Sequence, residues 1–382
     1  MSALPPHLLA AIEQLHPLVM SSCVRARRDG RLADEVVHCA DRHGLFATRV
    51  PAELGGHDLS LEEAYLLTEA LSYLDGSTGW TQSFMSLSAG LVGGHIGESG
   101  AHALLAANSG RWPRFAGTFP TLGVATPADG GVTVRGSWPF ASGISHAQWV
   151  AAGCVPAGAA PGDRTAVLWI AVPIEACRVR AGSWDVDAMQ ATGSSTFDLH
   201  DAFVPQDLVF TIGAPQERGR LIHKLATLVF ISPEHAGVAL GLARRALHEV
   251  ARIAVGKQRM GGRAPLAERG AFTRDLGRAD VALRAARTMM LEHFRTADAT
   301  NDPTALGARF VADIRACAAH AASVATEVAT LAYRYAGGSA LARSHPLHAA
   351  WADVLAATQH VHTNDENYET WGEIVASEAR LG

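Results

Sequence analysis

The sequence predicts an α+β fold that is mostly α-helical and is built from three consecutive zones. Residues 1–115 have the pattern of helices, residues 116–215 that of short strands, and residues 216–382 that of long helices. Hydrophobic residues make up 48% of the 382 residues, which is enough for a substantial core. We therefore expect an N-terminal helical domain, a small middle β-barrel domain and a C-terminal four-helix bundle.

In the first zone, a helix is expected to begin after Ser60. The run Ser60–Glu63 matches a capping box, in which Ser60 caps the helix and Glu63 reaches back to the cap. Apolar residues then recur at helical spacing up to Leu74. The glycine pairs and Asp-Gly steps around this segment predict loops.

The second zone changes to short β-rich runs, which include residues 132–134, 149–151, 166–172 and 197–199. Glycine-rich and proline-rich turns separate them. Several short strands at this spacing favour a small antiparallel barrel or sandwich.

The third zone predicts four long helices joined by short loops, which is typical of an antiparallel bundle. One helical stretch crosses Pro233, where a kink or break is expected. The other three run over roughly 265–298, 303–335 and 346–377, and Gly337-Gly338 is a stop signal for the second of these.

Composition excludes several classes of protein. The net charge is -5 and the pI about 6.4, so we expect no nucleic-acid partner. No secretory signal pattern and no run of 18 apolar residues occur, so we expect no membrane association and a cytoplasmic location. The five cysteines are scattered without a CxxC pair, which predicts reduced core thiols rather than disulfides or zinc.

Motif searches exclude other chemistries. There is no GxGxxG after a strand, no GxxxxGK[ST], no HExxH and no GxSxG. His360 and His362 flank Val361 on a predicted helix. Positions i and i+2 of a helix point about 200° apart, so the two imidazoles should not bind one ion, and no metal is expected.

The order helix–β–helix, together with motifs in several places, resembles the acyl-CoA dehydrogenase superfamily. The likeness spans nearly the whole chain. The matching segments are residues 46–56 (a P-x-x-x-G-G turn), 116–118, 138–143, 184–194 with 203–205, the position of Arg259, and 336–363.

The last segment departs from the dehydrogenase pattern at the catalytic position. Gly337-Gly338, Pro346 and Asp353 match the family, but Val361 stands where its glutamate would be. Glu234 is the nearest carboxylate on an earlier helix, and it is out of register with the family members that supply the glutamate there.

Two motifs are similar to the two-component flavin-dependent monooxygenases built on this fold. They are W-x-F-x-S-G-x-x-H-A-x-W over residues 138–149 and the pair Gln359-His360. Members of this branch oxidise aromatic rings, polyketides, amines or sulfur atoms with O2 and a reduced flavin delivered by a separate reductase.

The resemblance implies roles for individual residues. His360 would be catalytic, since an imidazole ordinarily has a pKa near the working pH, and Ser142 would contact flavin N5 or O4. Arg259 would pair with a diphosphate, which favours FAD over FMN. The implied flavin-binding set is Thr118, Phe140, Ser142, Arg259, Gly337, Gly338 and Thr363, and a weaker substrate-pocket set is Trp80, Glu234 and His235.

The predicted function is therefore that of an oxygenase. It would use FADH2 or FMNH2 and O2, through a hydroperoxide at flavin C4a, to oxidise a small aromatic, polyketide or amine substrate. A separate NAD(P)H:flavin reductase and a homotetramer are implied. Two alternatives stay open: an FAD-containing acyl-CoA dehydrogenase that uses Glu234 or another carboxylate, and a non-catalytic ligand-binding member of the fold.

Overall fold

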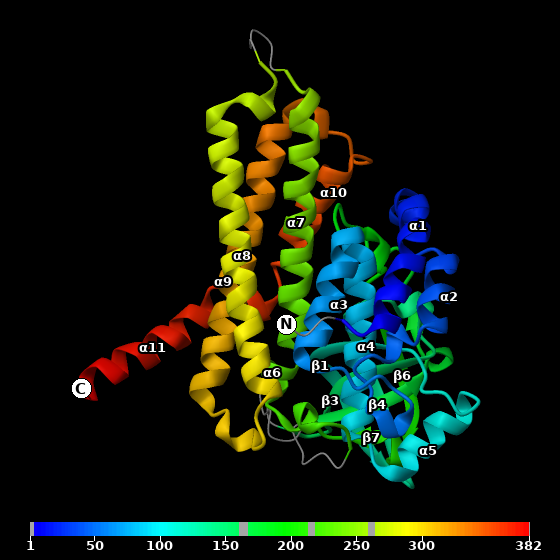
Figure 1. Cartoon of the computed structure of the whole chain (residues 1–382). Helices are drawn as coiled ribbons and strands as arrows, with labels where there is room; N and C mark the ends of the chain where they lie inside the picture. The colour runs from blue at the N-terminus through cyan, green and yellow to red at the C-terminus, as the bar shows by residue number, and fades with distance from the viewer. Residues whose placement is uncertain (1–3, 160–166, 213–217, 259–263, 382) are drawn as a thin grey trace.

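A computed structural model describes residues 4–159, 167–212, 218–258 and 264–381 of the chain. Its helices come before and after a central sheet, as expected (Figure 1). The N-terminal region is helical: α1 (Pro6–Asp29), α2 (Asp34–Arg42), α3 (Leu61–Leu74), α4 (Gly76–His95) and α5 (Glu98–Ala107).

The capping box predicted before α3 is confirmed. The Glu63 amide donates to Ser60 Oγ at 3.2 Å, and the Ser60 amide donates to the Glu63 carboxylate at 3.0 Å. The free amides of Leu61 and Glu62 donate to the carboxylate of Asp298, at 2.8 and 3.0 Å. The first turn of α3 is thereby joined to the C-terminal bundle.

The middle region forms one seven-stranded sheet in the order β5-β6-β2-β1-β3-β4-β7. Its strands are β1 (Phe115–Ala128), β2 (Gly131–Ala141), β3 (Trp149–Pro156), β4 (Leu168–Pro173), β5 (Arg178–Val179), β6 (Ser195–Pro205) and β7 (Val209–Phe210).

The expectation that all the strands pair antiparallel is wrong. β1 and β3 pair in parallel, from Phe115 opposite Trp149 to Ala125 opposite Pro156. Within the described residues the strand order is open, with β5 and β7 at the edges. The segment after β2 returns the chain to the start of β1, where the Gln148 amide donates to the Arg114 carbonyl. Short β-rich runs predict strands but not their partners, and this crossover carries no sequence signal.

The C-terminal region is again helical: α6 (Thr227–Phe230), α7 (Ser232–Gly256), α8 (Gly270–Asp298), α9 (Ala308–Ala336), α10 (Pro346–Ala357) and α11 (Glu366–Leu381). The predicted break at Pro233 is confirmed, since α6 ends at Phe230 and Pro233 lies in the first turn of α7. The stop at Gly337 is also confirmed, with φ +53° at the end of α9.

The single helix expected over 346–377 is wrong. α10 ends at Ala357, a turn follows that contains a short 3₁₀ helix (Val361–Thr363), and α11 then begins at Glu366. Polar side chains form additional hydrogen bonds to the backbone at this point. The Thr358 hydroxyl donates to the Val354 carbonyl at 3.0 Å, and His360 Nδ1 accepts from the His362 amide at 3.2 Å.

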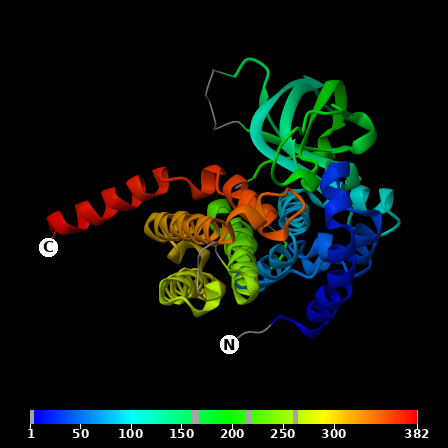
Figure 2. The same cartoon turned by 90° about the horizontal axis from the view of Figure 1, so that it is seen from above.

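The bundle stands beside the sheet and the N-terminal helices, and α11 projects away from both (Figure 2). Hydrophobic side chains form three buried clusters, in the first helices, around the sheet and in the bundle. None of the helices in the described part is both long and apolar enough to span a membrane. The sheet begins with Phe115 and ends with Phe210, and the domain borders themselves stay a prediction.

One buried ion pair joins the N-terminal region to α7. Arg49 and Glu234 lie 3.2 Å apart (Nε to Oε1), with side chains 1% and 2% exposed. The guanidinium also donates to the carbonyls of Leu59 at 3.2 Å and Phe230 at 2.6 Å. It lies 4.0 Å from the centroid of the Phe230 ring. Burial raises the pKa of Glu234 to about 7, although Arg49 opposes the shift.

We predict that Arg49→Met lowers the free energy of unfolding by about 3–5 kcal/mol, because it leaves Glu234 buried without its partner. The double variant Arg49→Met/Glu234→Gln should recover part of that loss, since no ionised group then lacks a counter-charge. Chemical denaturation of the purified variants measures both effects.

The matched control is Arg309→Met, which removes the exposed ion pair with Glu378. It should cost less than about 1 kcal/mol. Equal small losses for Arg49→Met and Arg309→Met would contradict a special role for the buried pair.

Candidate active site

Aromatic and imidazole rings from three elements meet between α4, α7 and the turn after α10. Trp80 and Phe84 are one helical turn apart on α4, and their rings stack with centroids 4.1 Å apart. His235, in the first turn of α7, lies edge-on to Phe84 at 5.0 Å. The His360 ring lies 4.2 Å from that of His235 and 6.4 Å from that of Trp80. Three of the predicted site residues are therefore in contact.

His360 is a neutral imidazole with a defined tautomer. Its Nδ1 accepts a backbone N–H from His362, so the proton of the neutral ring is on Nε2. Burial lowers the pKa of His360 to about 4. The expectation that this pKa lies near the working pH is corrected, because burial removes the water that would stabilise the charged ring. At neutral pH His360 offers an N–H donor and not an exchangeable positive charge.

His235 and His362 each keep a buried nitrogen without a hydrogen-bond partner among the described residues: Nε2 of His235 and Nδ1 of His362. His235 Nδ1 donates to the Ile231 carbonyl at 2.9 Å. His362 Nε2 donates at 2.9 Å to Ser232 Oγ, whose own proton goes to the Leu228 carbonyl. Burial lowers both pKa values, that of His362 to about 3.

The expected separation of His360 and His362 on opposite helix faces is wrong, since neither residue is helical in the α sense. The two rings lie against the same partner, His235, at 4.2 and 4.7 Å. Among the described residues, however, these three imidazoles do not form a group whose ligand atoms converge on one point.

A hydroxyl network connects this ring cluster to the sheet. Trp80 Nε1 donates to Ser142 Oγ at 2.9 Å, directly after the end of β2. Ser142 Oγ is 2.8 Å from Ser194 Oγ, which is 2.7 Å from Thr192 Oγ1. Thr192 donates to the Met189 carbonyl at 2.8 Å. Ser142, predicted to contact flavin, is thus held next to Trp80 and one ring away from His360.

Phe140 combines an exposed ring with a strained backbone. Its φ is +64°, which a bulky residue rarely adopts, and its side chain is 62% exposed. The Trp184 ring lies edge-on to it at 6.3 Å. Nearby, Thr118 is buried and donates to the Pro139 carbonyl at 2.9 Å. An apolar ring held outward at such a cost is a suitable platform for a planar ligand.

Of the other predicted flavin contacts, Thr363 lies at the ring cluster and the two glycines lie far from it. Thr363 is buried beside the histidines and donates to the His360 carbonyl at 3.0 Å. Gly337 and Gly338 follow α9, where Lys257 donates to the Ala336 carbonyl at 2.6 Å. Lys257 comes after the end of α7, whereas His235 is in its first turn, so roughly 33 Å of helix separates them. Arg259 lies outside the described residues.

Glu234, predicted for the substrate pocket, is not open to a ligand. Its carboxylate faces Arg49, and the side chain is 2% exposed. His235, the next residue, points instead toward Phe84 and His360.

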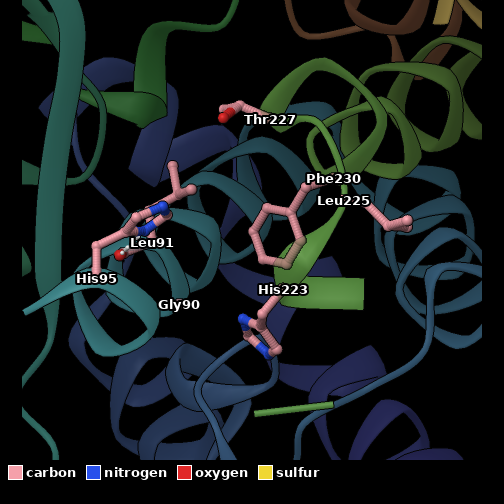
Figure 3. A pocket seen from close by; sticks show the side chains of 7 residues that line it. All are labelled: Gly90, Leu91, His95, His223, Leu225, Thr227 and Phe230. Carbon is pink, nitrogen blue, oxygen red and sulfur yellow. Dashed lines mark hydrogen bonds between the residues drawn. The ribbon is translucent and has the colours of Figure 1, made fainter. Parts of the chain in front are cut away.

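A hollow outside this cluster is lined by residues of α4 and of the segment before α7 (Figure 3). Its polar side chains are His95, Thr227 and His223, and His223 Nε2 donates to Asp58 Oδ1 at 2.8 Å. A second hollow lies between α4 and the sheet, next to Thr118.

Sequence reasoning missed Phe84, Ser194 and Thr192. Phe84 follows Trp80 by four residues on a predicted helix, so helical spacing could have identified it. Ser194 and Thr192 lie in the quoted 184–194 loop, but only the fold places them beside Ser142.

Comparison with known proteins agrees with this architecture. The model "Acyl-CoA dehydrogenase, N-terminal domain" matches residues 15–105, and "Acyl-CoA dehydrogenase, C-terminal domain" matches residues 234–365. An indole-3-acetate monooxygenase from Pseudomonas putida is 28% identical over 90% of this chain and 87% of its own length. The oxygenase component of an FADH2-dependent resorcinol hydroxylase from a Rhizobium species is 25% identical, over 94% and 91%.

Among solved structures, XiaF from a Streptomyces species in complex with FADH2 and glycerol has a TM-score of 0.85 at 24% identity. It covers 96% of this chain and 93% of its own. A complex of TdsC from a Paenibacillus strain with FMN and indole has a TM-score of 0.79 at 18% identity, over 97% of both chains. With both helical regions matched in order and relatives along most of its length, the chain belongs to the acyl-CoA dehydrogenase superfamily.

Proposed function

We propose that this chain is the oxygenase component of a two-component flavin-dependent monooxygenase. The observation that carries the proposal is the site itself. Val361, at the position of the dehydrogenase glutamate, is 63% exposed in a turn, and the neutral imidazole of His360 lies in the ring cluster instead. Relatives along most of the chain are named as monooxygenases and hydroxylases.

The residues present fit a reduced flavin, which when bound would supply the electrons that activate O2. Phe140 would support its ring system. The proton of Ser142 is used in the chain to Ser194 and Thr192, so its remaining lone pair would accept a hydrogen bond from the polar edge of the flavin. The FADH2 and FMN complexes of XiaF and TdsC support either cofactor, and the position of Arg259 favours FAD.

The substrate is proposed to be a small aromatic compound. Trp80, Phe84 and the imidazole rings offer flat apolar walls. One hydrogen-bond donor and one acceptor lie among these walls. The donor is the Nε2–H of His360, and the acceptor is the unprotonated Nε2 of His235. A ring bearing a hydroxyl or amine could be oriented by both while the walls keep water away.

A dehydrogenase function fits less well. Removing a proton next to a thioester carbonyl needs an ionised carboxylate that faces the substrate. Glu234 is fully buried against Arg49, and burial raises its pKa to about 7.

The proposal is tested by incubating the protein with a flavin reductase, NADH, FAD or FMN, and aromatic candidates in air. Oxygen from O2 should appear in the product, and NADH should be consumed. His360→Ala should lower hydroxylation by roughly 10²–10³, the usual cost of removing one positioned hydrogen-bond donor, while NADH consumption continues and releases hydrogen peroxide. Anaerobic reduction of bound flavin by an acyl-CoA, with an enoyl-CoA product, would overturn the proposal.

The control is Glu13→Gln, which changes an exposed side chain of α1, a helix that supplies no residue of the ring cluster, and should leave hydroxylation unchanged. Ionisation of His360 should not change the hydroxylation rate between about pH 8 and 5. The rate should fall only as the pH approaches the His360 pKa of about 4, where protonation fills Nδ1 and breaks its bond to the His362 amide. If the hydroxylation rate of the unaltered protein fell near pH 6.5, and His360→Ala lacked this fall, the neutral donor role would be contradicted.

A second variant tests the flavin platform. Phe140→Gly removes the exposed ring and places glycine at a positive φ, so the unfolding free energy should change by less than about 1 kcal/mol. Reduced-flavin affinity, measured anaerobically by fluorescence, should fall by about fivefold, since ring stacking is worth about 1 kcal/mol. A loss of about 3–5 kcal/mol in stability would identify Phe140 as a core residue instead.

We also propose a homotetramer in which a neighbour completes each flavin site. Gly337 and Gly338 lie about the length of α7 away from His235 in the same chain, so they could complete only a neighbour's flavin site. The helix α11 also projects away from the rest of its chain, where it could contact a neighbour (Figure 1). Light scattering should give about four times the 40.2 kDa chain mass. A monodisperse monomer that still hydroxylates would contradict the tetramer.

We also propose a cytoplasmic location. The five free cysteines fit it, because cysteines stay reduced in the cytoplasm.

A further inference from the structure

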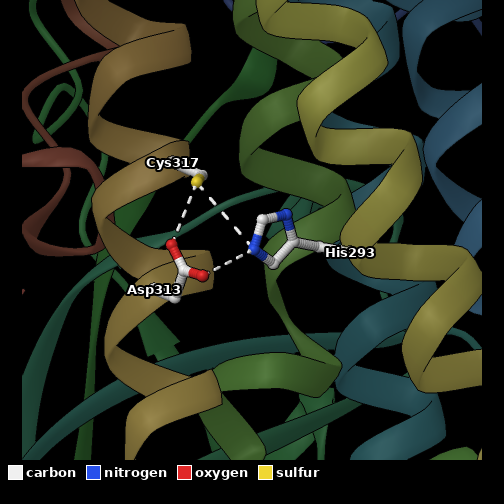
Figure 4. Close-up of side chains that lie close together, drawn as sticks. All are labelled: His293, Asp313 and Cys317. Carbon is white, nitrogen blue, oxygen red and sulfur yellow. Dashed lines mark hydrogen bonds and ion pairs between the residues drawn. The ribbon is translucent and has the colours of Figure 1, made fainter.

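Three potential ligand side chains converge between α8 and α9, in a place that the proposed oxygenase chemistry does not use. They are His293 on α8 and Asp313 and Cys317 on α9 (Figure 4). Asp313 and Cys317 are four residues apart and so lie on one face of α9. One ligand atom from each side chain lies within 4.8 Å of the others.

The imidazole is oriented as a metal ligand. His293 Nδ1 donates to the Met289 carbonyl at 2.9 Å, one turn earlier on the same helix. The neutral ring therefore presents the lone pair of Nε2 toward Asp313 and Cys317. Metal-bound histidines commonly donate their other N–H to a carbonyl in this way, which fixes the tautomer and the ring orientation.

The distances between the three groups are close to the edges of a zinc tetrahedron. Zinc bond lengths to N, O and S imply edges of about 3.3 Å for N···O, 3.5 Å for S···O and 3.6 Å for S···N. The observed distances are 3.3 Å (His293 Nε2 to Asp313 Oδ2), 3.5 Å (Cys317 Sγ to Asp313 Oδ1) and 3.9 Å (Cys317 Sγ to His293 Nε2). The first two end on different oxygens of Asp313, so its carboxylate must turn for one oxygen to meet both partners. Small side-chain rotations would bring all three groups onto one ion.

The arrangement does not suit nucleophilic catalysis by the thiol. In a catalytic triad the carboxylate and the nucleophile contact opposite nitrogens of the imidazole. Here Asp313 and Cys317 both face Nε2, and Nδ1 is occupied by a backbone carbonyl. Burial raises the pKa of Cys317 to about 12, so the free thiol is also unreactive.

We propose that His293, Asp313 and Cys317 bind one zinc-class divalent cation that links α8 to α9. The mixed N, O and S donor set suits Zn²⁺ rather than Mg²⁺ or Ca²⁺, which prefer oxygen alone. His293 and Asp313 are partly exposed, with side chains 14% and 29% accessible, so water can reach the ion as a fourth ligand. The cysteine spacing in the sequence did not indicate this cation site, because only the packing of α8 against α9 brings His293 next to Asp313 and Cys317.

The test uses the full-length protein, freed of metal with a chelator and kept under a thiol-free reductant. Titration with Co²⁺ should give one thiolate-to-cobalt charge-transfer band per chain and the visible bands of a tetrahedral ion. Added Zn²⁺ should remove both. Cys317→Ser should abolish the charge-transfer band, and His293→Gln and Asp313→Asn should each weaken Zn²⁺ binding by roughly 100-fold.

Cys177→Ser is the matched control, since Cys177 is a half-buried thiol in the sheet region and should leave binding unchanged. Circular dichroism and light scattering check that each variant keeps its fold and assembly. The proposal is overturned if the unaltered protein gives no charge-transfer band, if the band survives in Cys317→Ser, or if all three ligand variants bind Zn²⁺ as the unaltered protein does.

Discussion

The arrangement of the candidate site depends on one buried guanidinium. Arg49 reaches the carbonyls of Leu59 and Phe230 and the carboxylate of Glu234, so it contacts the segment before α3, the end of α6 and the first turn of α7. Its own backbone amide donates to Ser86 Oγ on α4 at 2.9 Å. Because Glu234 directly precedes His235, and α4 carries Trp80 and Phe84, this set of contacts fixes both sides of the ring cluster. A buried charge is costly without its partners, which makes the relative position of α4 and α7 specific.

The parts of the fold that the sequence predicted are those with local signals. The capping box at Ser60 and the break at Pro233 depend on hydrogen bonds and sterics within a few residues, and both are present. The parallel pairing of β1 with β3 depends on a crossover between distant segments, and short strand patterns do not encode it. The interruption of the last helix was missed because it depends on His360 Nδ1 accepting the His362 amide, a local contact that forms only when the surrounding packing allows it.

The site shows the same division. His360, Ser142 and Trp80 could be named from motifs, and the structure brings them together through one hydrogen bond and one ring contact. Their chemical state could not be predicted in this way. The ordinary pKa of histidine suggests a proton carrier, whereas burial holds His360 neutral and its bond from the His362 amide selects the Nε2–H tautomer. Environment, and not residue type, therefore changes the inferred role from acid–base group to hydrogen-bond donor.

The unpartnered nitrogens of His235 and His362 indicate where the cluster is incomplete by itself. An unsatisfied buried acceptor costs about 1–3 kcal/mol, and proteins seldom keep one without a functional reason. His362 Nδ1 belongs to a ring already anchored on Ser232, at the rear of the cluster. His235 Nε2 belongs to a ring in contact with both Phe84 and His360, so a donor placed there would also meet the aromatic walls and the His360 N–H. A bound hydroxyl or amine can therefore offset the free-energy cost of the unsatisfied Nε2 of His235. This nitrogen indicates more clearly than His362 Nδ1 which ligands the site accepts.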